Sequence, residues 1–394
     1  MNYLVFLCSL VCLASWSERC SAQTANPAGL PATLKLYVGC EEGSTKLLSF
    51  DTAKTELSTP TTLDALGTNV LWFEFDKAKK LVISAAADKF SGKDQTGTVF
   101  SASVGANGAL QKISSSPTDE APVSIELSPD EKLVMVANFN GGSIQTYELT
   151  GTGTLPDKPK ETFKFSGSGP VKERQGKASA HQVKMDPSGK VLLVPDLGSD
   201  RVHSFTLNKD LTLTRNPDIR VKAGCGPRHL VFSPQKTDLV VFYLLCELSN
   251  DLFLIELTDV KSKGKIKQTL NILPRGTNPS TFNAAEILIT PDKKFLYTTT
   301  RQKDKNGKDD DNIFSVFARD DTTGKLTPAG TFPTGGKGPR HFSFSPDPDA
   351  SLVVVSNQDS NRVNFHKRDP KTGALTLQRT TFESKTPVFA VFQA

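Results

Sequence analysis

The stretch Gly226-Pro227-Arg228-His229, with the turn Ser233-Pro234 behind it, returns later in the chain as Gly338-Pro339-Arg340-His341 with Ser345-Pro346. Further copies of the pattern can be aligned on a small residue and a turn proline, although the first copy is degenerate and the last is truncated. These copies begin at Thr68, Ala121, Ser179, Asn283 and Thr386. Repeats at intervals of about fifty residues, built from strand-like pieces, are typical of a solenoid or a propeller.

Each copy contains the same order of segments. In one of them, Ser124–Leu127 is followed by a Ser-Pro-Asp turn, an apolar segment at Leu133–Ala137, and an alternating segment at Ser143–Leu149. These features are strand and hairpin signals, and no part of the repeats has a sustained helical period with caps. Four antiparallel strands per copy form a propeller blade. The seven copies therefore predict an all-β fold, a seven-bladed β-propeller.

The two ends of the repeat region complement one another. Lys35–Gly39 and Lys46–Phe50 supply second and third strands without a first strand ahead of them, whereas Val388–Phe392 is a first strand with nothing after it. We expect these segments to share one blade, which closes the ring and hides the sheet edges. The propeller then occupies residues 34–394 as a single domain. Two separate β-sandwiches are the alternative.

The first 22 residues have the features of a signal peptide. The apolar stretch from Leu4 to Ala14 is too short to span a bilayer, and Cys20-Ser21-Ala22 offers small residues for cleavage. Residues 23–33 then form an N-terminal extension. Since no later stretch is a membrane-span candidate, we expect a secreted, extracellular protein with no membrane partner.

Cleavage would leave Cys40, Cys225 and Cys246. Three cysteines cannot all pair, so the chain is not a disulfide scaffold. Cys225 begins a first strand and Cys246 ends the adjacent second strand, which places both on one face of a blade. They either form a disulfide or remain free thiols that fill space.

The composition is that of a soluble globular protein, with 37% hydrophobic and 23% charged residues. The formal net charge of +5 is small and scattered along the chain. Nucleic-acid binding usually needs a concentrated basic stripe, so we expect no nucleic-acid partner. The expected partner is a small anionic lactone or carboxylate, bound by a monomer.

The direction of the strands predicts where a site would form. The start of each first strand and the end of each second strand meet at the same mouth of the central channel. Charged residues are concentrated at these positions of the aligned repeats. They are His181, Arg228, Arg340, His229, Glu286, His341, Asp196, Glu247 and Arg301.

Three arginines that converge on one polar mouth repel each other, which favours a site for an anionic ligand. Structural explanations remain open for the other residues. Asp196 could form a turn by bonding its own backbone, His229 and His341 could bond to neighbouring blades, and Glu286 could pair with an arginine of the next blade. A long loop at residues 166–178 leads into the same mouth and carries Arg174, so we expect it to form a rim or lid.

Several runs at the mouth and in the strands beside it form a distinctive set. They are Arg174-Gln175 before Ala180-His181, Pro195-Asp196-Leu197-Gly198, Gly224-Cys225-Gly226-Pro227-Arg228-His229, Glu247-Leu248-Ser249-Asn250, Ala284-Ala285-Glu286-Ile287 and Phe295-Leu296-Tyr297. As a set they resemble the seven-bladed lactonase family, which includes propeller-type 6-phosphogluconolactonase and the fungal carboxy-cis,cis-muconate cyclase. The resemblance covers nearly the whole mature chain.

The resemblance implies a catalytic set. A His, two Arg and a Glu form the proposed site of the muconate cyclase, and the matching positions here are His181, Arg228, Glu247 and Arg301. Where family members usually have Ser-Asn-Arg, this chain has Thr299-Thr300-Arg301 and keeps the arginine. Arg340, His229, His341, Arg174, Asp196 and Glu286 would then bind the substrate.

Lactone hydrolysis needs an activated water and fixed donors for the oxyanion. Glu247 or His181 could take the proton from water, while Arg228 and Arg301 hold a carboxylate, a phosphate or the oxyanion. The reverse reaction, lactonisation of an unsaturated dicarboxylate, would use the same arginines. Neither direction requires a metal or another cofactor.

Two rival classes remain. A calcium-dependent lactonase would need converging oxygen ligands, which Asn138, Asp196, Glu247 and Asn357 could approximate, although the arginines would repel the cation. A non-catalytic, secreted β-propeller that binds partners with its rim is the other alternative, because a fold does not by itself imply an activity.

Overall fold

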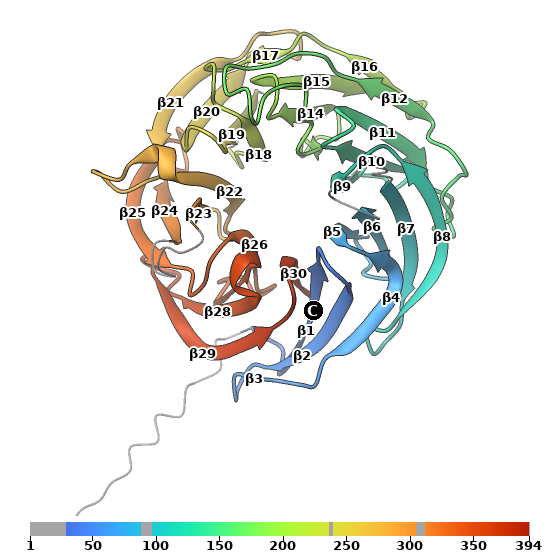
Figure 1. Ribbon diagram of the computed structural model, residues 1–394, viewed down its shortest axis with the longest axis vertical. Helices are drawn as coiled ribbons and strands as arrows, with labels where there is room; N and C mark the ends of the chain where they lie inside the picture. Colours follow the sequence, from blue (N-terminus) through green and yellow to red (C-terminus); the bar gives the residue numbers. More distant parts are fainter. Residues whose placement is uncertain (1–28, 88–96, 236–238, 305–311, 394) are drawn as a thin grey trace, which may run out of the picture.

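The computed structural model describes residues 29–87, 97–235, 239–304 and 312–393. Within these ranges the strands form seven antiparallel sheets, which stand as blades around a common axis (Figure 1). The predicted signal peptide lies outside the described residues. Of the predicted extension at 23–33, only residues 29–33 are described, and the first strand already begins at Thr33.

Blades I to VI follow one another along the chain, and blade VII is made of both ends. Blade I contains β5 (Val70–Phe75), β6 (Leu81–Ala87), β7 (Gly97–Val104) and β8 (Leu110–Thr118). Blade II contains β9 (Pro122–Leu127), β10 (Leu133–Asn138), β11 (Ser143–Glu148) and β12 (Glu161–Lys164). Blade III contains β13 (Lys184–Met185), β14 (Val191–Asp196), β15 (Arg201–Leu207), β16 (Leu213–Arg215) and β17 (Ile219–Arg220).

The remaining blades follow the same order. Blade IV contains β18 (Pro227–Phe232), β19 (Val240–Cys246), β20 (Asp251–Leu257) and β21 (Lys265–Asn271). Blade V contains β22 (Phe282–Ile289), β23 (Phe295–Gln302), β24 (Ile313–Arg319) and β25 (Leu326–Pro333), and is preceded by the 3-10 turn η1 (Pro279–Thr281). Blade VI contains β26 (Pro339–Phe344), β27 (Leu352–Asn357), β28 (Arg362–Arg368) and β29 (Leu375–Glu383), with η3 (Gln358–Ser360) between β27 and β28. Blade VII contains β30 (Pro387–Gln393), β1 (Thr33–Cys40), β2 (Ser44–Asp51), β3 (Glu56–Leu57) and β4 (Thr61–Thr68).

The ring closes through blade VII, as predicted. The C-terminal strand β30 pairs antiparallel with β1, with Tyr37 opposite Val391, and β1 pairs with β2. Strands β3 and β4 both pair with β2 on its outer side. The two ends of the chain therefore complete one sheet, and Figure 1 shows β30 beside β1 near the axis. The seven-bladed, all-β prediction is confirmed.

The core lies between the blades. Second strands such as β10 and β27 are buried along their whole length, because each blade packs its two faces against its two neighbours. The cluster around Tyr297 and Phe314 of blade V, for example, includes Phe342 and Val355 of blade VI. Burial on both faces explains why these strands read as continuous apolar runs in the sequence.

Bulges in the innermost strands shape the axial end of six blades. In β18, Pro227 lies opposite Cys246 and His229 lies opposite Leu245, so Arg228 is an extra residue in the ladder. The equivalent register shifts lie at the mouth ends of β5, β9, β22, β26 and β30. A bulge breaks the strict alternation of a strand and re-aims side chains. Two consecutive residues of one strand, such as Arg228 and His229, can thus face the same region.

Candidate active site

Three arginines from three different segments surround one buried carboxylate. Glu247 follows directly after β19, and its Oε1 accepts a hydrogen bond from Nη2 of Arg174 at 2.6 Å. Its Oε2 lies 3.1 Å from Nε of Arg228 and 2.9 Å from Nη2 of Arg301. Arg174 comes from the loop before blade III, Arg228 from β18 and Arg301 from β23. We call these four residues the arginine cluster.

The charges in the arginine cluster support one another. Burial would raise the pKa of Glu247, but Arg301, Arg174 and Arg228 outweigh it and lower the pKa to about 2. Burial, together with Arg301, lowers the pKa of Arg228 to about 9, so the guanidinium is still protonated at neutral pH. With three cations around one anion, the cluster keeps an excess of positive charge. It is suited to hold an anionic group.

Arg340 contributes a further cation to the same mouth from β26. Its Nη1 donates to Oε1 of Gln358 at 3.3 Å and lies 4.0 Å from Oε2 of Glu41. Gln358 also donates to Glu41. The side chain of Arg340 is thus held by the first turn of η3 and by the residue that follows β1.

A histidine and a glutamate form a second buried pair next to Arg228. Nδ1 of His229 lies 2.7 Å from Oε1 of Glu286, and both side chains are almost fully buried. The same oxygen of Glu286 accepts the backbone N–H of Ile287 at 3.0 Å. Burial raises the pKa of Glu286, but His229, His341 and Arg228 lower it to about 2. Burial lowers the pKa of His229, and the Arg228 charge adds to this effect against that of Glu286.

The other two mouth histidines have no carboxylate partner within the described ranges. The ring of His181 lies 5.0 Å from that of His229 and 5.3 Å from that of Phe139, measured between centroids. Burial, followed by the charge of Arg228, holds the pKa of His181 well below its usual value. His341 accepts the N–H of Ala390 at 3.4 Å, and burial lowers its pKa to about 4. Both rings are therefore neutral at pH 7.

These groups line a small pocket on the axis, which we call the axial pocket. Its volume is about 10 Å³, which is close to the space that one water molecule needs. It is lined by Leu71, Trp72, Val123, His181, Arg228, His229, Glu286, Arg340, His341 and Val388. One side is therefore apolar and the other carries cations and imidazoles. The ring of Trp72 packs against His229, His341 and Phe389.

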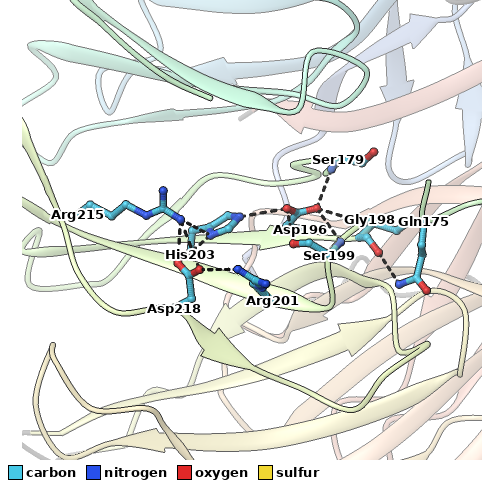
Figure 2. Close-up of polar contacts among 10 residues, drawn as sticks. Gln175, Ser179, Asp196, Gly198, Ser199, Arg201, His203, Arg215 and Asp218 are labelled. Carbon is cyan, nitrogen blue, oxygen red and sulfur yellow. Dashed lines mark hydrogen bonds and ion pairs between the residues drawn. The ribbon is translucent and has the colours of Figure 1, made fainter. Parts of the chain in front are cut away.

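Asp196 belongs to a different network, which Figure 2 shows. Its Oδ1 accepts the backbone N–H groups of Ser179, Gly198 and Ser199, and its Oδ2 accepts from the hydroxyl of Ser199 and lies 3.1 Å from Nε2 of His203. The side chain is fully buried. Asp196 thus fixes the backbone just ahead of His181, and it is not among the residues that line the axial pocket. It supports the site through the backbone.

The loop at 166–178 is held in place by hydrogen bonds of a buried glutamine. Gln175 is buried, and its Nε2 donates to the carbonyl of Leu197 and to Oδ1 of Asp200. Asp200 also accepts the N–H groups of Gly224 and Gly226. One carboxylate therefore joins the loop that carries Arg174 to the segment that leads into β18. A Cβ at Gly198 would lie 1.8 Å from the carbonyl oxygen of Lys177, so only glycine lets the loop pass this close.

Cys225 and Cys246 form a disulfide, with Cα atoms 5.2 Å apart. The first alternative for these cysteines is thus the one found. Cys246 directly precedes Glu247, and Cys225 lies three positions before Arg228. Cys40 is a buried free thiol.

The structure brings nine of the ten expected site residues to one mouth. Six of them line the axial pocket. Glu247 joins these six through its ion pair with Arg228, and Arg174 and Arg301 pair with Glu247 in turn. Asp196 lies in the separate network of Figure 2. Trp72 was not predicted from the sequence, because its repeat lacks the turn proline. The backbone hydrogen bonds show that this segment matches the other repeats. The N–H of Asp76 donates to the carbonyl of Leu81 in blade I, as the N–H of Ser128 donates to the carbonyl of Leu133 in blade II.

The oxygen set considered for calcium does not assemble. Asn138 bonds with Thr118 and Ser143, Asn357 with the carbonyl of Thr334, and Glu247 with its arginines. Among the described residues, no three His, Cys, Asp or Glu side chains are grouped so that they could hold a metal ion. In the same part of the chain, no helix has the length and apolar character needed to cross a membrane.

Comparison with known proteins agrees with this architecture. Residues 35–392 match the model of the family "Lactonase, 7-bladed beta-propeller". A protein of Arthroderma benhamiae named "Probable 6-phosphogluconolactonase" is 31% identical over 367 residues, which are 92% of this chain and 89% of that protein. The 6-phosphogluconolactonase of Bacillus subtilis is 28% identical, over 90% of this chain and 97% of its own length.

A solved structure extends the likeness to three dimensions. The periplasmic gluconolactonase of Pseudomonas aeruginosa superposes with a TM-score of 0.81 and 25% identity, over 92% of this chain and 99% of that chain. Together with the matched repeats and the shared blade VII, this identifies the chain as a member of the seven-bladed β-propeller lactonase family.

Proposed function

We propose that this protein is an exported lactonase that hydrolyses a small anionic lactone, such as a phosphorylated or oxidised sugar-acid lactone, without a metal ion. The arginine cluster carries this proposal. Arg174, Arg228 and Arg301 share one carboxylate, and Arg340 lies at the same mouth. This excess of fixed cations provides paired donors for a carboxylate or phosphate and for the oxyanion. The names of the family's relatives supply the reaction class.

Hydrolysis is the favoured direction. Relatives in Bacillus subtilis and Pseudomonas aeruginosa are named as lactonases, and the axial pocket has one polar side and room for about one water. Lactonisation of a muconate would need the same cations for two carboxylates, and it is the second candidate activity of the same residues. Export is supported by the features of residues 1–22. Mass spectrometry of the secreted protein should find a chain that begins after Ala22.

The test is an activity screen on the mature chain. We expect acid release in a pH-stat from 6-phosphogluconolactone or another anionic sugar lactone, faster than from neutral glucono-lactone, and no effect of EDTA. Loss of one fixed donor to an oxyanion costs about 10²–10³-fold in kcat, so Arg228→Met should lose about that much. Arg379→Met, on the exposed face of outer strand β29, is the matched control.

Two outcomes would contradict the proposal. If EDTA abolishes activity and calcium restores it, the metal-dependent class is correct. If no lactone or muconate is turned over while the variant Arg228→Met loses binding of anions such as citrate, the propeller is a binding module. In that case the arginine cluster still forms the binding site.

A further inference from the structure

Two residues that line the axial pocket each have a buried ring nitrogen without a partner in the described chain. Nδ1 of His181 and Nε2 of His229 have no hydrogen-bond partner among the described residues. Both rings line the axial pocket. An unpaired buried polar atom is costly, and such atoms are found where a ligand or a reacting group is to be held. Their surroundings decide which of the two nitrogens is prepared to take a proton.

The contact with Glu286 fixes the protonation of His229. A carboxylate oxygen can only accept a hydrogen bond, so the nitrogen 2.7 Å from Oε1 of Glu286 must carry hydrogen. That nitrogen is Nδ1. In the neutral ring Nε2 is then the bare nitrogen with a lone pair. The carboxylate of Glu286 is itself held by the N–H of Ile287, so the orientation of the imidazole is fixed from behind.

We propose that the His229–Glu286 pair, and not Glu247, supplies the general base of the lactonase reaction. This inference rests on the proposed function. Nε2 of His229 takes a proton from water while the water oxygen forms a bond to the lactone carbonyl carbon. The carbonyl electron pair moves onto its oxygen, which becomes the oxyanion and is held by an arginine. When this pair returns, the ring C–O bond breaks, and the released ring oxygen takes the proton back from Nε2. The new carboxylic acid then loses its proton to solvent.

Glu247 is less suited to this role. Oε1 is bonded to Arg174 and Oε2 lies against both Arg228 and Arg301. These three cations lower the pKa of Glu247 to about 2, and a base so weak takes a proton poorly from water near neutral pH. Its geometry fits another task, which is to hold the three guanidinium groups in fixed positions.

His181, and Glu286 acting without His229, are also weaker candidates for the general base than His229. No carboxylate of the described residues contacts the ring of His181, and the nearby Arg228 and Arg340 oppose its protonation. A proton on His229, by contrast, is stabilised by Glu286, as in other histidine–carboxylate pairs. Oε2 of Glu286 accepts no hydrogen bond from the part of the chain that the structure describes, but the pKa of Glu286 is about 2. His229 is therefore the catalytic residue, and Glu286 is a positioning residue that acts through it.

The kinetic test compares four variants of the mature chain over pH 4 to 8. In the wild type, kcat should rise with pH through an acidic limb below the usual histidine value of about 6.5 and then level off, because burial lowers the pKa of His229. Variant His229→Gln should lose at least about 10²-fold in kcat. Variant Glu286→Gln should lower kcat and move the limb to lower pH, and Glu286→Asp should restore part of both.

The control is His366→Gln. His366 is a buried histidine of β28 with a lowered pKa and, among the residues described, no carboxylate partner. The variant His366→Gln should leave the limb in place. A wild-type kcat that is flat from pH 4 to 8, or a limb that Glu286→Gln does not move, would overturn the inference. So would a His229→Gln variant with wild-type kcat.

A second measurement does not depend on activity. With only five histidines in the chain, nitrogen-15 labelling of histidine allows each ring to be assigned by loss of its signal in a variant. We expect His229 as the tautomer with hydrogen on Nδ1, and a further fall of its pKa in Glu286→Gln. Hydrogen on Nε2 would overturn the inference. If the tautomer is as expected but no lactone is hydrolysed, the proposed function fails and the arrangement of the pair stands.

Discussion

Two histidine–carboxylate groups lie in neighbouring blades, and the pKa of the histidine is shifted in opposite directions in the two groups. His203 of blade III lies between two carboxylates, with Nε2 at 3.1 Å from Asp196 and Nδ1 at 2.9 Å from Asp218. His229 of blade IV has one carboxylate, Glu286, and an arginine beside it. Both imidazoles are buried. Burial lowers the pKa of each ring, yet the two aspartates raise the pKa of His203 overall, whereas that of His229 stays lowered.

The difference shows what a second carboxylate does. Both nitrogens of His203 face acceptors, so both carry hydrogen and the ring is an imidazolium that links Asp196 to Asp218 (Figure 2). No ring nitrogen of His203 is left to accept a proton. The ring is also stacked on that of Phe165, with a distance of 3.8 Å between the centroids. His229 contacts one carboxylate, so its Nε2 has no partner in the described part of the chain. The first group is built for stability and the second for proton transfer.

The largest expected effect is a loss of folding stability, which should be greater when the His203 group is changed than when the His229 group is changed. Asp196→Asn leaves the imidazolium of His203 with one partner, and breaking a buried ion pair in this way costs about 3–5 kcal/mol. Glu286→Gln should cost less, about 1 kcal/mol, because neutral His229 can still donate to the amide oxygen. Urea unfolding of both variants, with exposed Glu383→Gln as control, checks this. Equal losses would mean that both histidines are charged.

The Cys225–Cys246 disulfide is expected to contribute somewhat less. Cys225 and Cys246 are separated by 21 residues, and closing a loop of this length stabilises the folded state by about 3 kcal/mol. The variant Cys225→Ala/Cys246→Ala should lose about this amount in urea unfolding. Because the bond lies next to Glu247, kcat should also fall, whereas the acidic limb assigned to His229 should not move. A shifted limb would mean that the bond also orients the His229–Glu286 pair.

The smallest effect is the pH dependence of stability. A histidine with a raised pKa stabilises the fold below its unfolded value of about 6.5, and this contribution is lost as pH rises through the higher folded pKa. The advantage of the wild type over His203→Gln should therefore shrink between neutral and mildly alkaline pH.

For His229, whose pKa is lowered, the wild type should instead lose stability relative to His229→Gln as pH falls below about 6.5. Urea unfolding at a series of pH values measures both trends. If the His203 advantage grows with pH, the ring between Asp196 and Asp218 is not an imidazolium.

Much of the molecule could be read from the repeats. The turn prolines and apolar runs located six blades, and the unmatched strands at 35–50 and 388–392 predicted the seventh. These are local properties of strands and turns, so they are visible in a single sequence. The repeats also predicted which residues share one mouth, because every blade has the same strand direction. Trp72 was not predicted as a residue of the mouth, because its copy carries Asp76-Lys77 in place of the turn proline.

The partners within that mouth could not be read in the same way. The alternation of a strand would turn either Arg228 or His229 away from the axis, and it is the bulge in β18 that lets both line the axial pocket. Arg174 meets Glu247 across 73 positions, and His229 meets Glu286 across 57. Asp196, which the repeats place beside the site residues, turns its carboxylate to its own loop instead.

The repeats dictate the all-β ring, its closure and the types of residue at the mouth, because each copy carries its own period and polarity, whereas the family is indicated by the resemblance of particular motifs. Folding assigns the partners of the carboxylates: Glu247 binds three arginines, Glu286 binds a histidine of the mouth, and Asp196 binds the backbone and His203. Those assignments depend on the angle between packed blades and on distances of a few ångströms between charges in a buried environment. Electrostatic energies vary steeply over such distances, and no pattern along one chain records them.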